Sequence, residues 1–479
     1  MVQLLLNDRL VQTDQPAALP ALDFVREHQH LRGTKTGCRE GDCGACTVLL
    51  GELTPDGTAV RYRAMTSCLL PLANVAGKHL ITIEGLNLSA RPTHLNRAQR
   101  AIADCGGTQC GFCTVGFAVS LAGHCLTGTG APTVEQTVAS IDGNICRCTG
   151  YKSLERAAAR LTEELATRPG TDALPWLTEN GFVPAYFTGV ADRLRTLHSF
   201  PPTRLPSHPL TFLAGGTDLL VQRPEAMLTT ATANLFDQSG LRGIRRKGTR
   251  ITIGAATTAQ EMMESDVLAA IFPRLRQQLK LVSSTPIRQM GTVGGNLCNA
   301  SPIGDLTCWF LALGADLTLA DAETGAERTL PLQELYAGYK QLAKKSTEYL
   351  AAISFDALAP DEFFNFEKVS KRTHLDIASV NSAARFSVRD GVITAVRVSA
   401  GGVFATPLLL KRTSEYLTGR SLSDETMLAA NEIAQQEIAP IDDARGTEAY
   451  KRLLVRQLLR AQCVEYFPQS SQSSQRARR

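Results

Sequence analysis

The stretch GCREGDCGACT, residues 37–47, brings three cysteines into one short segment that is punctuated by glycine. Cys38, Cys43 and Cys46 follow the spacing C-x4-C-x2-C. Glycine tolerates backbone conformations that other residues avoid, so this segment is able to wrap tightly and aim its backbone N–H groups at the sulfurs. The stretch therefore predicts a loop that holds a metal group, and it calls for a fourth ligand.

The flanking sequence supplies that ligand. VQLLLN and LVQTD flank residues 7–9 as a predicted hairpin, and CTVLLGEL and AVRYRAMTSC flank residues 54–57 as a second one. Cys68 then returns beside Cys46 and completes the spacing C-x4-C-x2-C-x21-C, the plant-type ferredoxin arrangement for a [2Fe-2S] cluster. Zinc is the alternative, but a structural zinc site usually shows paired C-x2-C knuckles.

A second cysteine set has Cys110 and Cys113 as C-x2-C, followed by Cys146 and Cys148 as C-x-C. The surrounding segments place apolar residues three and four positions apart, which predicts four helices: NRAQRAIADC, TVGFAVSLAGHCL, TVEQTVASI and LERAAARLTEELA. We expect the cysteines to lie in loops at helix N-termini, where backbone N–H groups stabilise a negatively charged cluster. The cysteines outside these spacings are expected to be structural: Cys105, Cys125, Cys298 and Cys308.

Two glycine turns lie in the middle of the chain. LTFLAGGTDLLVQ at 210–222 contains Gly215 and Gly216, and RQMGTVGGNLCNASPIGD at 288–305 contains Gly294 and Gly295. Alone, each turn would more often mark a hairpin than a cofactor site. Together they suggest backbone amides that approach phosphate oxygens, without the G-x-G-x-x-G signature of the dinucleotide fold.

The composition narrows the class of protein. The length of 479 residues predicts several domains, and a formal charge of +4 with scattered basic residues argues against nucleic-acid binding. Neither a basic leader nor a long apolar run is present, which argues against export and against membrane insertion. Thirteen cysteines in such a chain favour metal ligation in the cytoplasm over disulfides.

Four quoted stretches resemble the iron–sulfur half of the xanthine dehydrogenase family of molybdenum hydroxylases: TGCREGDCGACTVLL, SCLLPLANVAGKHLITIEGL, QCGFCTVGF and GNICRCTGY. The resemblance implies a ferredoxin-like β-grasp domain that binds one [2Fe-2S] cluster through Cys38, Cys43, Cys46 and Cys68. It implies a four-helix domain that binds a second [2Fe-2S] cluster through Cys110, Cys113, Cys146 and Cys148. In this family the helical-domain cluster lies nearest the molybdenum and the other cluster lies nearest the flavin.

The segments FLAGGTDLL and GTVGGNLCNASPIGD resemble the two flavin-binding segments of the same family, whose FAD domain is of the vanillyl-alcohol-oxidase type. Carried over by motif, the first segment would cradle FAD with Phe212, Leu213, Ala214, Gly215, Gly216, Thr217, Asp218 and Leu219. The further FAD contacts implied by the resemblance are Thr292, Gly295, Asn296, Asp305, Leu350 and Lys368.

Two other features concern the electron acceptor. Tyr339, in YAGYK, matches an aromatic residue that stands where nicotinamide docks, and a partly buried core tyrosine is the alternative. KRTHLDIASV retains Asp376 but has Thr373 and Leu375 where some relatives carry charged residues. NAD⁺ is the expected acceptor, and oxygen or ferredoxin is the alternative.

The expected fold class is α+β multidomain. Its parts are a ferredoxin-like domain (residues 1–88), a helical [2Fe-2S] domain (89–166), a linker (167–205), an FAD-binding domain (206–385), a small α+β C-terminal domain (386–468) and a disordered tail (469–479). In the C-terminal part, RFSVRDGVITAVRVSAGGV predicts two strands around Asp390 and Gly391, and two helical stretches follow.

The resemblance implies an electron-transfer subunit. Single-chain relatives continue into a molybdopterin region that this sequence lacks, so we expect a molybdopterin-binding large subunit as partner, in an α2β2 heterotetramer. Electrons from hypoxanthine or xanthine hydroxylation on that partner would pass through both clusters to FAD and NAD⁺, and this chain would hold no catalytic residue for the hydroxylation. The alternatives are the equivalent subunit of an aldehyde or N-heterocycle hydroxylase and a non-catalytic zinc-binding regulator.

Overall fold

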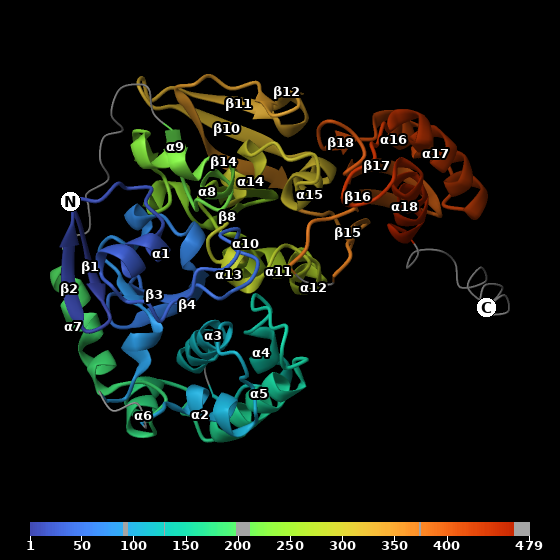
Figure 1. The fold of residues 1–479 in the computed structure, drawn as a ribbon. Helices are drawn as coiled ribbons and strands as arrows, with labels where there is room; N and C mark the ends of the chain where they lie inside the picture. The colour runs from blue at the N-terminus through green and yellow to red at the C-terminus, as the bar shows by residue number, and fades with distance from the viewer. Residues whose placement is uncertain (90–93, 129, 198–210, 373–374, 464–479) are drawn as a thin grey trace. The chain divides into compact units, whose positions relative to one another are not determined.

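The computed structural model describes residues 1–479 except 90–93, 129, 198–210, 373–374 and 464–479. The chain folds into two compact units (Figure 1). The first contains residues 1–238 and 284–291, and the second contains residues 239–283 and 292–479. The expected tail lies outside the described residues.

A five-stranded mixed sheet opens the first unit, in the order β2-β1-β5-β3-β4. Its strands are β1 (Val2–Leu6), β2 (Arg9–Thr13), β3 (Thr47–Leu53), β4 (Val60–Thr66) and β5 (His79–Ile81). Both predicted hairpins are confirmed, since β1 pairs antiparallel with β2 and β3 pairs antiparallel with β4. Helix α1 (Ala21–Asp23) and the helical turn Phe24–His28 cover the sheet, and Phe24 lies in its core.

The four predicted helices follow. They are α2 (Arg97–Asp104), α3 (Thr114–Leu126), α4 (Val134–Ala139) and α5 (Lys152–Glu164). Capping boxes start α2 at Asn96 and α4 at Thr133, because each N-cap side chain and the glutamine three residues later satisfy each other's backbone N–H groups. Helix α3 is buried almost all round, which explains why its sequence is apolar rather than amphipathic.

The expected linker, residues 167–205, contains helices α6 (Ala173–Glu179) and α7 (Val190–Thr196), and residues 198–205 lie outside the described part of the chain. Val190 and Leu194 of α7 pack against Leu5 of β1. The segment is helical because it finds an apolar partner on the first sheet, a tertiary effect that its weak local periodicity does not reveal.

The first unit ends with a small parallel pair and short helices. These elements are β6 (Thr211–Leu213), α8 (Leu219–Gln222), α9 (Pro224–Thr229), β7 (Thr232–Asn234) and the separate helix α13 (Thr285–Arg288). Leu213, Leu220 and Met290 belong to the same apolar core as the first sheet. The first predicted flavin segment is therefore part of the unit that carries the cysteines.

The second unit contains an antiparallel five-stranded sheet in the order β11-β10-β14-β9-β8. Its strands are β8 (Ile244–Lys247), β9 (Arg250–Gly254), β10 (Asp316–Asp321), β11 (Glu327–Pro331) and β14 (Glu348–Asp356). Its helices are α10 (Ala259–Met263), α11 (Asp266–Ala269), α12 (Leu275–Lys280), α14 (Val293–Cys298) and α15 (Asp305–Leu313). A short hairpin, β12 (Tyr336–Gly338) and β13 (Gln341–Leu342), lies beyond β11 in the chain.

A second sheet in this unit has the order β15-β16-β17-β18. The elements are β15 (Glu362–Val369), β16 (Val380–Arg389), β17 (Val392–Gly401), β18 (Leu408–Leu409), α16 (Lys411–Leu417), α17 (Asp424–Glu437) and α18 (Glu448–Ala461). The predicted hairpin around Asp390 is confirmed. The boundary expected between residues 385 and 386 falls inside β16, a strand that pairs with β15 along the whole length of β15.

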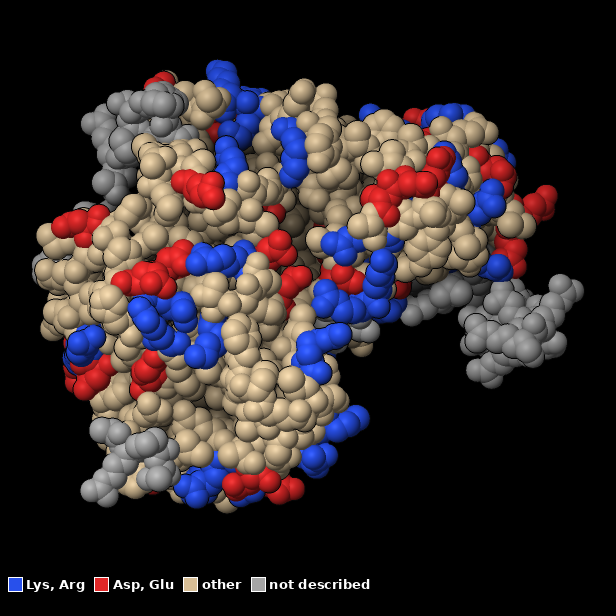
Figure 2. Space-filling view, viewed as in Figure 1, with Lys and Arg blue, Asp and Glu red and all other residues tan. Residues whose placement is uncertain are grey.

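The surface charges and the helix lengths relate to the expectations about nucleic-acid binding and membrane insertion. On the face shown in Figure 2, lysine and arginine side chains lie interspersed with acidic ones. None of the described helices combines the length and the apolar character that a membrane span needs.

Candidate functional site

The first cysteine loop has the backbone shape that its glycines predict. Gly41 and Gly44 have φ values of 78° and 67°, in the region that glycine reaches without strain. Backbone N–H groups then point at sulfur: the N–H groups of Glu40 and Cys43 both lie 3.4 Å from Cys38 Sγ. Such donors stabilise a negatively charged sulfur, as a cluster ligand requires.

The four thiols of this set lie in two pairs. Cys43 hydrogen-bonds to Cys38, and this bond together with the backbone N–H groups lowers the pKa of Cys38 to about 5. Cys46 lies within hydrogen-bonding reach of Cys68, and this contact lowers the pKa of Cys46. Two thiolates for each of two irons is the ligand set of a [2Fe-2S] cluster, whereas zinc needs its ligands around one point. Among the described residues, no three His, Cys, Asp or Glu side chains surround one point in the way that a single metal ion requires.

The second set repeats this pairing. The sulfur atoms of Cys110 and Cys148 are 3.7 Å apart, and Cys113 hydrogen-bonds to Cys146. Cys113 is the N-cap residue of α3, so the start of this helix lies beside the thiols as expected. Cys110 and Cys148 are exposed, whereas Cys146 is buried. One edge of this site therefore faces solvent in the isolated chain.

A hydrogen bond joins the two cysteine loops. The backbone N–H of Ile145 donates to the carbonyl oxygen of Cys43 over 3.0 Å, and Ile145 directly precedes Cys146. Asn144 supports this contact, since its Nδ2 donates to Gly44 O over 3.1 Å while Ser120 Oγ donates to its Oδ1 over 2.8 Å. Cysteine spacing reveals neither Asn144 nor Ser120, because their roles depend on a contact between residues about one hundred positions apart.

The first predicted flavin segment, residues 212–219, lies against the stretch of chain that follows Cys68. A Cβ at Gly216 would lie 2.9 Å from the carbonyl oxygen of Leu69, the residue after Cys68. Asn74 Nδ2 donates to Ala214 O over 2.9 Å. A Cβ at Gly215 would lie 2.0 Å from Met290 O, so this glycine is required by close backbone packing whether or not a phosphate approaches it.

The second predicted flavin segment begins α14 in the second unit. Thr292 Oγ1 caps the helix by accepting from the N–H of Gly295 over 3.1 Å. A Cβ at Gly295 would meet only that hydroxyl within 4 Å. Asn296 Oδ1 is buried and has no hydrogen-bond donor among the described residues. An orphaned acceptor next to a glycine that has few neighbours fits a site that receives N–H or O–H donors from a cofactor such as FAD.

Asp305 and Lys368, both expected at the FAD site, form a buried pair. Lys368 Nζ lies 2.7 Å from Asp305 Oδ2 and donates to Leu281 O over 2.8 Å. Asn381 Nδ2 donates to Asp305 Oδ1 over 2.6 Å. The carboxylate is thus held on both oxygens, and Asn381 is a member of this site that no sequence motif indicated.

The two remaining predicted site residues are a buried leucine and an exposed tyrosine. Leu350 is buried in β14 opposite Leu319, where its side chain contributes to the core. Tyr339 is 61% exposed in the turn between β12 and β13, so the alternative of a partly buried core tyrosine is wrong. The nicotinamide role of Tyr339 stays a prediction.

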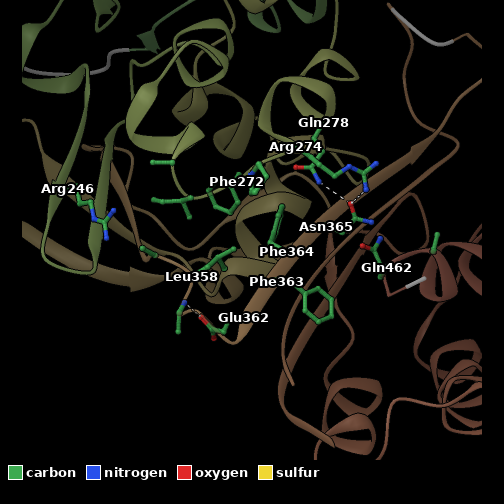
Figure 3. Close-up of a pocket in the computed structure, with 16 residues that line it drawn as sticks. Arg246, Phe272, Arg274, Gln278, Leu358, Glu362, Phe363, Phe364, Asn365 and Gln462 are labelled. Atoms are coloured by element: carbon green, nitrogen blue, oxygen red, sulfur yellow. Dashed lines mark hydrogen bonds between the residues drawn. The ribbon is translucent and has the colours of Figure 1, made fainter. Parts of the chain in front are cut away.

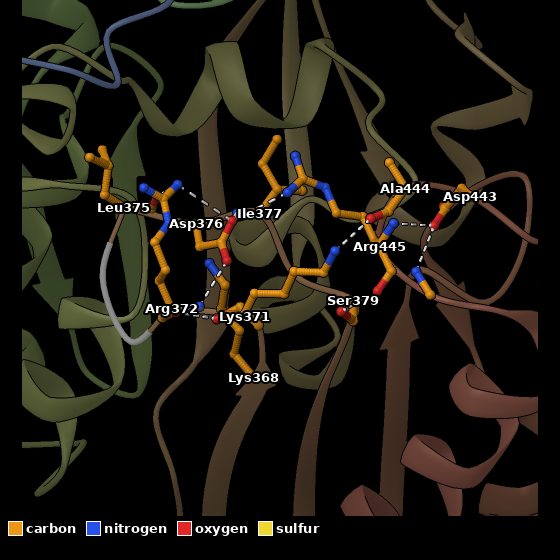
Figure 4. A network of polar contacts seen from close by, with 12 residues as sticks. Lys368, Lys371, Arg372, Leu375, Asp376, Ile377, Ser379, Asp443, Ala444 and Arg445 are labelled. Carbon is orange, nitrogen blue, oxygen red and sulfur yellow. Dashed lines mark hydrogen bonds and ion pairs between the residues drawn. The ribbon is translucent and has the colours of Figure 1, made fainter. Parts of the chain in front are cut away.

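The loop that carries Asp376 is tied to the C-terminal part of the second unit. Asp376 Oδ1 lies 3.3 Å from Arg445 Nη1 and 3.8 Å from Arg372 Nη2 (Figure 4). Lys371 Nζ donates to Ala444 O over 3.0 Å. Thr373 lies outside the described residues, and Leu375 is buried.

The cysteines outside the two sets are all unpaired thiols. Cys125 and Cys308 are buried, and burial raises the pKa of each thiol to about 12. A buried neutral thiol behaves as a small apolar side chain, as expected for both residues.

Four domain families match the chain. They are described as "2Fe-2S iron-sulfur cluster binding domain" (residues 5–73), "[2Fe-2S] binding domain" (82–159), "FAD binding domain in molybdopterin dehydrogenase" (192–355) and "CO dehydrogenase flavoprotein C-terminal domain" (366–465). Their order along the chain follows the order of the domains expected from the sequence.

Curated relatives cover most of this chain. A xanthine dehydrogenase from Oryza sativa subsp. japonica is 28% identical over 516 residues, which cover 91% of this chain and 37% of that protein. Aldehyde oxidase 1 from Bos taurus is 25% identical over 499 residues, again 91% of this chain and 37% of that protein. The chain thus spans less than two fifths of the length of these relatives.

Solved structures resemble part of the chain. The crystal structure of a Cu,Mo-CO dehydrogenase in its cyanide-inactivated form is 29% identical, with a TM-score of 0.50 over 53% of this chain and 88% of that one. A carbon monoxide dehydrogenase from Hydrogenophaga pseudoflava is 26% identical, with the same TM-score and coverage. The domain matches and these relatives together show that the chain carries two [2Fe-2S] binding domains, an FAD-binding domain and a CO dehydrogenase flavoprotein C-terminal domain, and that it is similar over most of its length to molybdenum hydroxylases.

Proposed function

We propose that this chain is the electron-transfer subunit of a xanthine dehydrogenase. It would receive electrons from hypoxanthine or xanthine hydroxylation at a molybdenum site on a partner chain and deliver them to NAD⁺. When bound, the two [2Fe-2S] clusters would supply single-electron transfer and FAD would supply hydride transfer. The residues of this chain would hold these groups in order and at fixed separation.

One observation carries the proposal: the two cysteine loops and the first flavin segment contact one another in sequence within the first unit. The N–H of Ile145 binds the carbonyl oxygen of Cys43. In the same unit, a Cβ at Gly216 would lie 2.9 Å from the carbonyl oxygen of Leu69, which follows Cys68. These contacts would fix both clusters and one end of the flavin site on a single rigid body.

The exposed edge of the second cysteine set suggests where electrons enter. Cys110 and Cys148 are exposed, and the neighbouring Phe112 and Tyr151 are 46% and 38% exposed. Apolar and aromatic side chains around exposed ligands are typical of a surface that a partner covers. We assign this edge to the molybdopterin-binding subunit of an α2β2 heterotetramer.

The substrate proposal rests on the relatives. The xanthine dehydrogenases span 91% of this chain at 26–28% identity in rice and Arabidopsis thaliana. Aldehyde oxidase 1 from Bos taurus covers the same share, which keeps an aldehyde hydroxylase as the second candidate. Because the hydroxylation site would lie on the partner, no residue of this chain distinguishes the two.

NAD⁺ as acceptor and a cytoplasmic location complete the proposal. The exposed ring of Tyr339 is accessible to a planar nicotinamide. None of the thirteen cysteines forms a disulfide, in keeping with a reducing compartment. The zinc-binding alternative predicts zinc without acid-labile sulfide, whereas the pairwise thiols favour about four irons and four sulfides per chain.

The function is tested by separating the two halves of the reaction. The FAD-loaded chain alone should oxidise NADH with an artificial dye and should not oxidise xanthine, and addition of the large subunit should restore xanthine-dependent NAD⁺ reduction. A monodisperse, FAD-loaded chain that fails to oxidise NADH would refute NAD⁺ as acceptor. Restored activity with an aldehyde but not with xanthine would favour the second candidate.

A further inference from the structure

Two parts of the structure contain polar groups that the proposed function does not use: a cavity in the second unit and a turn beside the second cysteine set. The cavity has a volume of about 390 Å³ and is lined by α12, β15 and the end of α18 (Figure 3). Several of its polar side chains bond within the chain. Gln278 Nε2 donates to Asn365 Oδ1 over 3.1 Å, and Glu362 Oε2 accepts from Arg385. The turn, residues 146–151, instead directs polar groups at an expected cluster ligand.

The backbone of this turn is left-handed at two consecutive residues. Gly150 and Tyr151 have φ values of 64° and 66°. Glycine adopts this conformation freely, whereas a tyrosine adopts it at a cost and keeps it only where neighbouring contacts hold it in place. One such contact is present, because the backbone N–H of Cys146 donates to Tyr151 Oη over 3.0 Å. The chain therefore folds back on Cys146.

Thr149 lies inside the turn and contacts the sulfur of Cys146 twice. Its Oγ1 is 3.2 Å from Cys146 Sγ, and its backbone N–H donates to the same sulfur over 3.5 Å. The backbone N–H of Tyr151 donates to Thr149 Oγ1 over 3.4 Å, so the hydroxyl oxygen is an acceptor on that side. A cysteine that ligates a cluster is a thiolate, which has no hydrogen to donate. The O–H of Thr149 therefore donates to Cys146 Sγ when the cluster is bound.

A hydrogen bond to a ligand sulfur affects how readily the cluster is reduced. Reduction adds one electron, and hence one negative charge, to the cluster and its sulfurs without breaking a bond. A donor aimed at a sulfur stabilises this added charge and raises the reduction potential. Cys146 is buried whereas Cys110 and Cys148 are exposed. The Thr149 hydrogen bond is therefore made in the part of the site where water screens it least.

We propose that Thr149 raises the reduction potential of the helical-domain cluster by donating its hydroxyl hydrogen to Cys146 Sγ. Tyr151 is a positioning residue, because it holds the turn that aims Thr149 at the sulfur. The inference rests on the proposed function, in which Cys146 ligates a cluster. A raised potential favours the arrival of electrons at this cluster, whose exposed edge is assigned above to the partner.

The test is a redox titration of the cluster-loaded full chain, with dithionite as reductant and electron paramagnetic resonance as readout. Cys148→Ser changes one ligand of the helical-domain cluster and so identifies its signal. Thr149→Val keeps the shape of the side chain and removes the hydroxyl. It should lower the equilibrium constant for one-electron reduction of this cluster about tenfold, which corresponds to about 59 mV, and leave the other cluster unchanged. Thr149→Ser keeps the hydroxyl and should restore the potential of the unaltered chain.

Thr114→Val is the matched control. Thr114 directly follows Cys113, and its hydroxyl hydrogen-bonds to that of Thr108 over 2.8 Å, so this variant removes a hydroxyl next to another expected ligand. It should leave both potentials unchanged. An unchanged potential in Thr149→Val, an equal shift in Thr114→Val, or loss of the cluster from Thr149→Val would overturn the role of Thr149. Absence of two cluster signals from the unaltered chain would overturn the proposed function, and this inference with it.

Discussion

His79 shows how a single buried residue ties the predicted linker to the ferredoxin-like sheet. Its Nδ1 lies 3.1 Å from Tyr62 Oη and its Nε2 lies 2.9 Å from Asn7 O. The rings of Tyr186 and Phe187 pack against it. Burial lowers the pKa of His79 from 6.5 to about 3, so the imidazole is neutral in the folded protein.

This histidine predicts a pH dependence. In the unfolded chain His79 takes up a proton below pH 6.5, while the folded form does not until about pH 3. The contribution to stability is therefore complete above pH 6.5 and falls by at most about 1.4 kcal/mol per pH unit as the pH drops towards 3. His79→Gln should melt lower than the unaltered chain at pH 7.5, and the difference should shrink at pH 5. A difference in melting temperature that is constant with pH would contradict this role.

Gly215 and Gly295 differ in what a side chain at each position would contact. A Cβ at Gly215 would collide with backbone, whereas a Cβ at Gly295 meets only the Thr292 hydroxyl at 2.9 Å. Gly295→Val should therefore lower FAD occupancy with a smaller loss of melting temperature than Gly215→Val. Gly240→Val is the control, because a Cβ there meets nothing within 4 Å. Full FAD occupancy of purified Gly295→Val would argue against a phosphate-binding role for this turn.

At the scale of elements, helix α13 docks on the loop that leads to Cys146. Asp142 accepts from the Thr285 N–H over 2.9 Å and lies 3.1 Å from Arg288 Nη2. The side chains of Arg288 and Asp142 are 2% and 5% exposed. A Cβ at Gly143 would meet the ring of Pro286 at 2.6 Å, so the two segments are in close contact. This pair connects the helical-domain cluster site to the segment that precedes Thr292.

Removal of the positive charge of Arg288 should destabilise the folded protein. Arg288→Met leaves a buried carboxylate without its cation and should reduce the free energy of unfolding by about 3 kcal/mol. It should also broaden the paramagnetic signal of the helical-domain cluster, because Asp142 lies in the loop that leads to Cys146. Lys152→Met is the matched control, since the Lys152–Glu155 pair is exposed and should leave stability unchanged. An equal effect of both variants would mean that Arg288 does not position this loop.

The elements that the sequence predicts correctly are those whose signals lie within a short stretch of the chain. Helices α2 to α5 have apolar residues at helical spacing, and two of them carry capping boxes at Asn96 and Thr133. The cysteine spacing likewise predicts both thiol sets. The helices at 173–196, the start of the C-terminal sheet at β15 and the roles of Asn144 and Asn381 could not be predicted, because each depends on a partner far away in the chain.

At the scale of the whole molecule, the first unit combines both cysteine sets with the first flavin segment. The second unit contains the second flavin segment, the Asp305–Lys368 pair and the C-terminal sheet. The chain crosses from the first unit to the second between Gly291 and Thr292, directly before the Gly294–Gly295 turn. The proposed electron path through the cysteine loops therefore lies within one unit.

In the proposed function, this chain stores and passes electrons on two [2Fe-2S] clusters and one FAD. An anaerobic reductive titration of the FAD-loaded chain, followed by absorbance and electron paramagnetic resonance, tests it most directly. We expect uptake of about four electrons per chain, two by FAD and one by each cluster, with two distinguishable cluster signals. Uptake of about two electrons without any cluster signal, in protein that contains zinc and no sulfide, would contradict it.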